Sequence, residues 1–186
     1  MMNRDDTKLN ENTESDGILD EAVAEGGGQS VATAFHEAGH AVMALSFGCP
    51  IKKVTIVPGR SSQGQYRLGV CELQKGRSVN ARNRLDDEIV ILFAGMVAEA
   101  HFTGHYCENG AAEDLRMIRR LLCRRVGSEK QHERLHRRLL ARTEHLLGDE
   151  GIALAVEMVA EELLQKHTIS GRAVRHFYQQ AIKTAD

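Results

Sequence analysis

Two histidines and a glutamate form the pattern in this sequence that most clearly predicts chemistry. His36, Glu37 and His40 make an H-E-x-x-H run inside the apolar segment AFHEAGHAVMAL. A spacing of four residues places both imidazoles on one face of a helix, one turn apart. Two such imidazoles suit a single tetrahedral zinc ion, and Glu37 on the adjacent flank can reach a water molecule. The run therefore predicts a zinc site with a general base beside it.

A catalytic zinc site of this kind needs a third protein ligand. The longer pattern H-E-x-x-H-x-x-G-x-x-H is not completed here, since Met43 and Ser46 stand at its later positions. The third ligand must come from elsewhere in the chain. Its candidates are Glu88, Glu99, Glu113, Asp114 and the His101/His105 pair. Asp114 is attractive on local grounds, because GAAEDL places it in the first turn of a helix after a glycine-containing loop.

A second H-E-x-x-H run is formed by His132, Glu133 and His136. Its surroundings, KQHERLHRRLLAR, are strongly basic, and basic neighbours repel a divalent cation. We interpret this copy as a coincidence on a solvated helix face. His101 and His105 lack the intervening glutamate and are interpreted as loop histidines near the mouth of the site.

Helices dominate the elements that must position these residues. A helix is expected over 31–47 with Ser30 as its N-cap, and strands are expected at Ile51–Val57 and Tyr66–Leu73. Further helices are expected at 79–104, 111–126, 131–147, 150–166 and 170–184. The predicted fold is mostly α within the α+β class, a zincin-like helical domain with one small β element of two or three strands.

Composition indicates one globular domain with a tail. The chain has 186 residues, 27% of them charged, and a net charge of −2. Residues 1–27 hold eight acidic and two basic residues and are expected to be an acidic flexible tail, with the domain that carries the zinc site over 28–186. The N-terminus lacks the apolar core of a signal peptide, and the apolar window Ile89–Ala100 is too short to span a bilayer. Four cysteines without a C-x-x-C pair fit a reducing compartment, so a soluble, cytoplasmic protein is expected.

Residues 116–142 are strongly basic, with ten arginines and lysines against Glu129 and Glu133. Such a face can dock nucleic acid, an acidic partner or the acidic tail of this chain. No aromatic residue interrupts the stretch, so stacking on single strands is not expected, and nucleic acid is not a predicted partner. We interpret the stretch first as a solvated helix face.

From about Thr33 to the C-terminus, the chain resembles the peptidase domain of the FtsH-type AAA proteases, which are membrane-bound ATP-dependent zinc metalloproteases. Its landmarks occur in the family's order: FHEAGHAVMAL resembles the zinc helix, KKVTIVP and LGV the paired strands beside the cleft, and ILFAGMVAEAHFTG the glycine-containing helix. GAAEDL resembles the segment with the third ligand, and LLQKHTISGRAV the final helix junction.

This resemblance implies roles for individual residues. His36, His40 and Asp114 would bind zinc, Glu37 would be the general base, and Glu99 would orient a histidine. No Walker A pattern and no transmembrane segment occur in the sequence, so the family's motor and anchor are expected to be missing from this polypeptide.

The predicted function is that of a soluble zinc metalloendopeptidase acting on flexible or unfolded protein segments. Val54, Thr55 and Ile56 are expected to hold an extended peptide by backbone pairing. A separate AAA ATPase in trans and assembly into a homo-oligomer are further expectations. The alternatives are a regulatory peptidase dedicated to one protein, or a non-catalytic, zinc-stabilised interaction module. Retention of Glu37 argues against the module, because a structural zinc site has no use for a base.

Overall fold

The computed structural model describes residues 15–60, 64, 66–74, 84–104, 106–107 and 110–185, with side chains from residue 27 onward. The helices of the described part are α1 (Ser15–Ser46), α2 (Arg84–Thr103), α3 (Ala112–Cys123), α4 (Glu129–Leu147), α5 (Glu150–Lys166) and α6 (Gly171–Ala185). The strands are β1 (Ile51–Thr55), β2 (Gly59–Arg60), β3 (Tyr66–Arg67), β4 (Val70–Leu73) and β5 (Thr168–Ser170). The mostly α fold class with a few strands is confirmed.

Helix α1 begins well before the predicted start. The prediction that Ser30 is its N-cap is wrong, because the helix already runs from Ser15 and passes through three consecutive glycines, 26–28. Glycine tolerates helical dihedrals and costs only about 1 kcal/mol per residue relative to alanine. A helix anchored by packing of its second half can therefore extend through them. Residues 1–14 lie outside the described residues, and the flexibility of the acidic segment stays a prediction.

Five short strands form two small antiparallel sheets rather than one element of two or three strands. The larger sheet has the order β4-β1-β5, and β2 pairs with β3 in a separate hairpin. The strand predicted for Tyr66–Leu73 is split at Leu68 and Gly69 into β3 and β4. Strand β5 was missed because TIS has only three residues between two helices.

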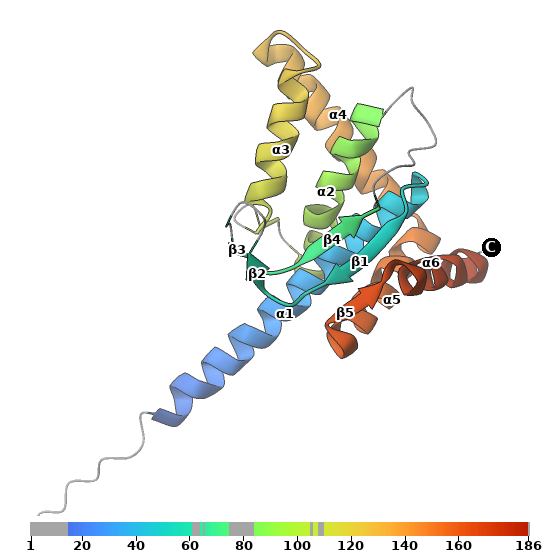
Figure 1. Ribbon diagram of the computed structural model, residues 1–186. Coiled ribbons are helices and arrows are strands. Elements are labelled where there is room, and N and C mark those ends of the chain that lie inside the picture. The colour runs from blue at the N-terminus through green and yellow to red at the C-terminus, as the bar shows by residue number, and fades with distance from the viewer. Residues whose placement is uncertain are drawn as a thin grey trace, which may run out of the picture.

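The buried half of α1 runs through the middle of the molecule, packed against α2 and α5 (Figure 1). Alanines on this half are fully buried, so neighbouring helices approach closely. The tightest approach is at Gly39, where a Cβ atom would lie 2.4 Å from the carbonyl oxygen of Ala94 on α2 and 2.6 Å from the Cβ of Ala98. This crossing fixes the position of α2 relative to the H-E-x-x-H run.

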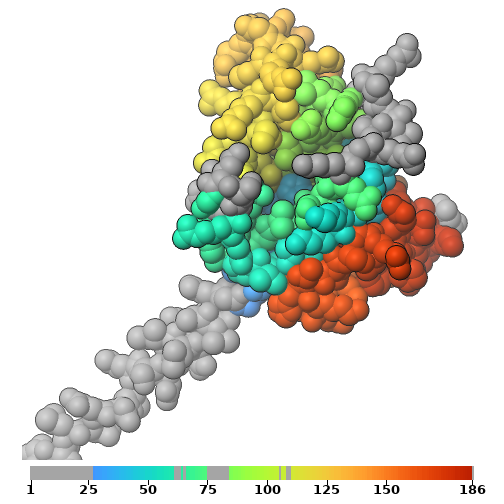
Figure 2. Space-filling view, in the orientation of Figure 1, coloured from blue at the N-terminus to red at the C-terminus, as the bar shows by residue number. Residues whose placement is uncertain are grey.

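The strands cover one face of the helices. In Figure 2 the cyan and green strand region lies between the yellow helix α3 and the red C-terminal segment. None of the described helices is both long and apolar enough to cross a membrane. The four cysteines are free thiols.

Candidate metal centre

His36 and His40 bring their rings together on the buried face of α1. The rings meet edge to face, with their centroids 4.7 Å apart. Asp114, in the first turn of α3, places Oδ2 3.1 Å from His36 Nε2 and 3.2 Å from His40 Nε2. One ligand atom from each residue lies within 4.8 Å of the others, and this is the only such cluster among the residues that the structure describes.

The second nitrogen of each ring has its own partner. His40 Nδ1 donates a hydrogen bond to the carbonyl oxygen of Ile91 at 2.7 Å. His36 Nδ1 lies 3.0 Å from Glu99 Oε2. A neutral imidazole with its hydrogen on Nδ1 carries its lone pair on Nε2, the atom that faces Asp114. Two Nε2 atoms and one carboxylate oxygen therefore fit a zinc ion that keeps a coordination position open.

Gly95 on α2 makes room for the two rings. A Cβ atom at this position would lie 2.4 Å from His40 Nε2 and 2.7 Å from His36 Nε2. Such distances are far shorter than ordinary van der Waals contact. The imidazoles can occupy their positions because the facing helix has no side chain there.

Glu37 lies beside the cluster and is nearly buried, with 7% of its surface exposed. Its Oε2 is buried without a hydrogen-bond partner. Gly69 closes over it from the strand side: a Cβ atom there would lie 2.8 Å from Oε1. Burial raises the pKa of Glu37, while the charges of His40 and His36 act in the opposite direction. A buried carboxylate with a free oxygen is suited to accept a proton.

Without a metal ion, the cluster holds protons. Burial alone would lower the pKa of His36, but its hydrogen bonds to Asp114 and Glu99 outweigh burial and raise the pKa to about 10. The pKa of His40 is also raised, because Asp114 outweighs burial. Burial raises the pKa of Asp114, but the charges and hydrogen bonds of His40 and His36 outweigh burial and hold this pKa far below its ordinary value. A proton and a metal ion compete for the same Nε2 atoms.

The other residues considered as the third ligand lie elsewhere. Glu113 is not part of the cluster and instead forms an ion pair with Arg67, its Oε1 lying 2.6 Å from Nη2. Glu88 and His101 are exposed on α2. His105 lies outside the described residues. Glu99 takes a supporting position next to His36.

The backbone of β1 is not available to a substrate. Val54 is paired with Cys71 of β4 on one side and with Ile169 of β5 on the other. The next amide, that of Ile56, donates to the carbonyl of His167 at 2.9 Å. The prediction that Val54, Thr55 and Ile56 pair with a peptide is therefore wrong, because β1 is the central strand. Among the described residues, β4 has no strand on its outer side.

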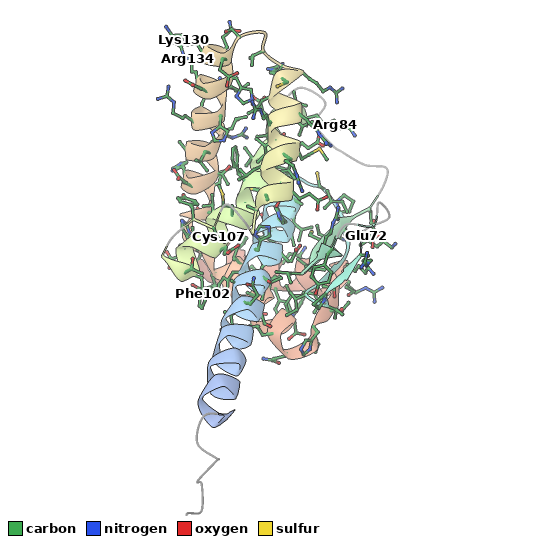
Figure 3. The ribbon with its side chains drawn as sticks, turned by 90° about the vertical axis from the view of Figure 1, so that its left-hand side faces the viewer. Glu72, Arg84, Phe102, Cys107, Lys130 and Arg134 are labelled. Carbon is green, nitrogen blue, oxygen red and sulfur yellow. The ribbon has the colours of Figure 1, made fainter. Side chains whose placement is uncertain are left out.

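The second H-E-x-x-H run lies on α4 and does not form a cluster of three possible metal ligands among the described residues. The ring of His136 meets the Phe93 ring edge to face at 5.0 Å. His132 Nε2 is buried without a hydrogen-bond partner. Figure 3 shows Lys130 and Arg134 projecting near the outer end of the same helix, so the run has a basic environment.

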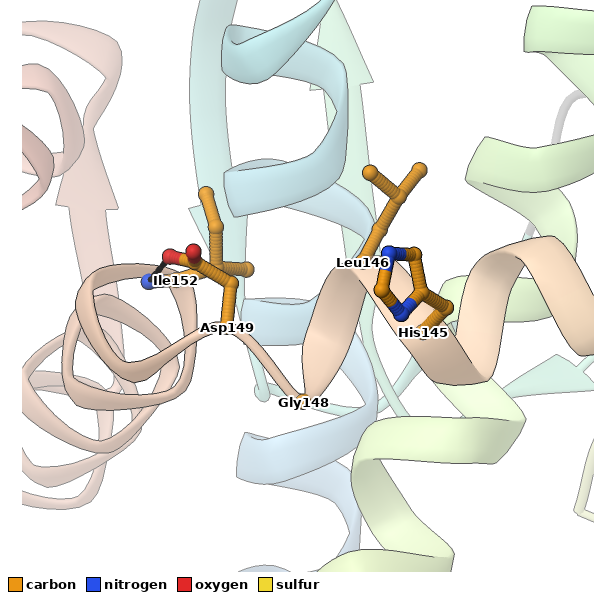
Figure 4. A pocket seen from close by; sticks show the side chains of 5 residues that line it. All are labelled: His145, Leu146, Gly148, Asp149 and Ile152. Carbon is orange, nitrogen blue, oxygen red and sulfur yellow. Dashed lines mark hydrogen bonds between the residues drawn. The ribbon is translucent and has the colours of Figure 1, made fainter.

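A hollow at the junction of α4 and α5 carries no comparable chemistry. It is lined by His145, Leu146, Gly148, Asp149 and Ile152 (Figure 4). Asp149 Oδ1 accepts a hydrogen bond from the Ile152 amide at 3.1 Å and caps α5. The hollow is a helix junction and shares no residue with the metal cluster.

Four supporting groups were not identified from the sequence. Gly95 and Gly69 carry no functional atom, and their importance appears only when the facing residues are known. The partner of His40 is the backbone carbonyl of Ile91 on α2. Any residue type supplies such a carbonyl, so the sequence gives no signal for it. Arg67 has a sequence signal only in hindsight, as a charged residue next to the LGV segment.

Comparison with known proteins places this site in a family. The model of peptidase family M41 matches residues 27–129, more than half of the chain. This range contains the two histidines, the glutamate and Asp114.

Curated relatives agree with the family match. A protein of Protochlamydia amoebophila named ATP-dependent zinc metalloprotease FtsH is 34% identical over 104 residues, which are 53% of this chain and 11% of that protein. A protein of the same name from Acidimicrobium ferrooxidans is 37% identical over 106 residues, 55% of this chain and 15% of the relative. A third, from Marinobacter nauticus, is 31% identical over 132 residues, 69% of this chain and 19% of the relative. The chain thus spans less than a fifth of each of these relatives.

Proposed function

Because the chain belongs to peptidase family M41, we propose that it is a zinc metalloendopeptidase that hydrolyses peptide bonds in flexible or unfolded protein segments. The observation that carries this proposal is the convergence of His36, His40 and Asp114 next to Glu37, whose Oε2 has no partner. Three ligands with a free carboxylate beside them match the requirements of a hydrolytic site better than those of a structural one, which closes with a fourth protein ligand.

The zinc ligands would be His36 Nε2, His40 Nε2 and an oxygen of Asp114. When bound, zinc supplies a Lewis acid that polarises the scissile carbonyl and makes water more acidic. Glu99 holds the His36 ring through Nδ1, and the Ile91 carbonyl holds His40 in the same way. These contacts direct both Nε2 atoms toward the same point.

Glu37 would act as the general base. Its free Oε2 accepts the proton of the attacking water, and the same carboxyl group then passes the proton to the leaving amine nitrogen. Burial keeps bulk water away from this carboxylate and strengthens its interaction with nearby charges. The closeness of Gly69 limits the number of positions that the side chain can adopt.

The outer edge of β4 is the surface on which an extended substrate would lie. It continues from Gly69, which contacts Glu37, so a strand paired with β4 would pass beside the base. Backbone pairing favours extended segments of almost any sequence. Folded proteins do not offer such segments, so a separate AAA ATPase that unfolds substrates is the proposed partner. The relatives' name, ATP-dependent zinc metalloprotease, motivates this part of the proposal.

The test replaces Glu37 by Gln and compares it with Glu133→Gln, the same position of the second H-E-x-x-H run. Cleavage of labelled casein by zinc-loaded protein should fall by a factor of about 100 or more in Glu37→Gln, in the range lost when a general base is removed. Zinc per chain, measured by mass spectrometry, should stay at the wild-type level, and Glu133→Gln should match wild type in both assays. Equal cleavage by wild type and Glu37→Gln would refute the assigned base. A zinc-loaded wild type that cleaves nothing would favour the non-catalytic module.

A further inference from the structure

Arg67 joins the strand region to the helix that carries Asp114. It ends β3, and its Nη2 lies 2.6 Å from Oε1 of Glu113, the residue directly before Asp114. Figure 1 shows the β2–β3 hairpin beside the first turn of α3, consistent with this ion pair. The guanidinium is thus held at the rim of the metal cluster.

The same segment also reaches the proposed base. Gly69, two residues after Arg67, closes over Glu37. The positive charge of Arg67 is among the charges that act on the carboxylate of Glu37. One short stretch of chain therefore places a cation near Glu37 and binds it to Glu113, the residue before Asp114.

The guanidinium of Arg67 has hydrogen-bond donors that the ion pair with Glu113 does not use. An arginine offers five N–H groups, and the ion pair with Glu113 is formed through Nη2. Arg67 Nε has no hydrogen-bond partner, although it is buried. About 38% of the side chain is exposed, so a ligand can approach its outer part. The ion pair with Glu113 is formed through Nη2 and competes with a further carboxylate only in part, because other N–H groups of the guanidinium stay available.

We propose that Arg67 is a specificity-determining residue that binds an acidic side chain of the substrate close to the scissile bond. This inference rests on the proposed peptidase function. Glu37, Glu99, Glu113 and Asp114 surround the site with negative charge and would repel an acidic peptide. Among the described residues, Arg67 is a cation that offsets this repulsion, two residues before Gly69 and close to the edge of β4 where an extended peptide would lie.

The experiment measures peptide binding rather than turnover. Zinc-loaded Glu37→Gln protein is titrated with fluorescent decapeptides in which one Glu is moved along a neutral sequence, and with matched peptides that carry Gln instead. At one position, the Glu peptide should bind about five- to tenfold more tightly than the Gln peptide, as for a partly exposed charge-assisted hydrogen bond. Adding Arg67→Met should bring the ratio of the Glu-peptide and Gln-peptide affinities close to one. Adding Arg60→Met, an exposed arginine on the neighbouring strand, should leave the ratio unchanged.

Two further variants separate binding from folding. Glu113→Gln removes the competitor for Arg67 and should increase the preference for Glu, whereas Arg67→Glu should reverse it in favour of peptides carrying Lys. A structural role of the ion pair would weaken all peptides equally in these variants. Equal binding of the Glu and Gln peptides at every position in the Glu37→Gln protein would overturn the proposal. So would an affinity ratio that Arg67→Met leaves unchanged. Because no cleavage is needed, these results are independent of whether Glu37 is the base.

Discussion

The glycine that faces the two histidines gives a sharp test of the metal centre. In Gly95→Ala, the new Cβ atom would lie 2.4 Å from His40 Nε2, against about 3.5 Å for an ordinary contact. The ring must therefore move by about 1 Å, and its hydrogen bond to the Ile91 carbonyl opposes this movement. Displacement on this scale should weaken zinc binding by a factor of about 10 to 100, comparable to the loss of a supporting partner of a ligand.

The free energy of unfolding should respond differently. Alanine improves the helix by up to about 1 kcal/mol, and overpacking costs about 1 to 3 kcal/mol, so metal-free Gly95→Ala should lose no more than about 2 kcal/mol. Gly39→Ala is the matched variant, because its Cβ atom would lie 2.4 Å from a backbone atom, the Ala94 carbonyl oxygen. No rotamer change relieves that contact, and a loss of about 3 kcal/mol or more is expected.

Competition with a chromophoric zinc chelator measures the affinity, and urea denaturation with EDTA present measures the stability. Wild-type zinc affinity in Gly95→Ala would refute the reasoning, since the two rings would then bind the ion without the space that the glycine provides. Equal stability of the two variants would show that the α1–α2 crossing is looser than these distances imply.

Two more predictions concern the cluster itself. Asp114→Ala should lose most of its bound zinc while Glu113→Ala keeps it, as measured by metal analysis after dialysis, and full occupancy of Asp114→Ala would assign the third ligand to another residue. Metal-free protein should lose stability between pH 7 and pH 10: folding raises the pKa of His36 from 6.5 to about 10, so the stabilisation by its charge is complete below about 6.5 and is lost as the pH rises through about 10. Urea midpoints with EDTA at several pH values test this, and midpoints that stay constant over this range would contradict it.

The sequence predicted the local parts of the site better than the non-local ones. The spacing of His36 and His40 determines their common face within a single helix, so it required no knowledge of the rest of the fold. Asp114 is 74 positions beyond His40. Its place in the first turn of a helix favours it among several candidates, but only the resemblance to a family implies that it is the ligand. The partners on α2, by contrast, depend on how that helix crosses α1, which no local pattern encodes.

The errors in the fold have a similar origin. The predicted start of the first helix, after an N-cap at Ser30, is too late, because packing of residues 33–44 supports a helix that continues toward the N-terminus through the glycines. The prediction that β1 can pair with a substrate fails because β5 occupies its second edge. This partner strand has only three residues, and Thr168 lies 113 positions after Thr55. Short strands that pair over such distances give no periodic signal.

The two H-E-x-x-H runs show what the motif requires beyond its letters. Both helices that carry a run pack against α2. Toward α1, this helix presents Gly95, together with the Ile91 carbonyl and Glu99, so both rings fit and each Nδ1 has a partner. Toward α4 it presents Phe93, whose ring occupies the space beside His136. The two runs therefore differ in the facing helix, where the absence of a side chain at Gly95 makes room for the rings of His36 and His40.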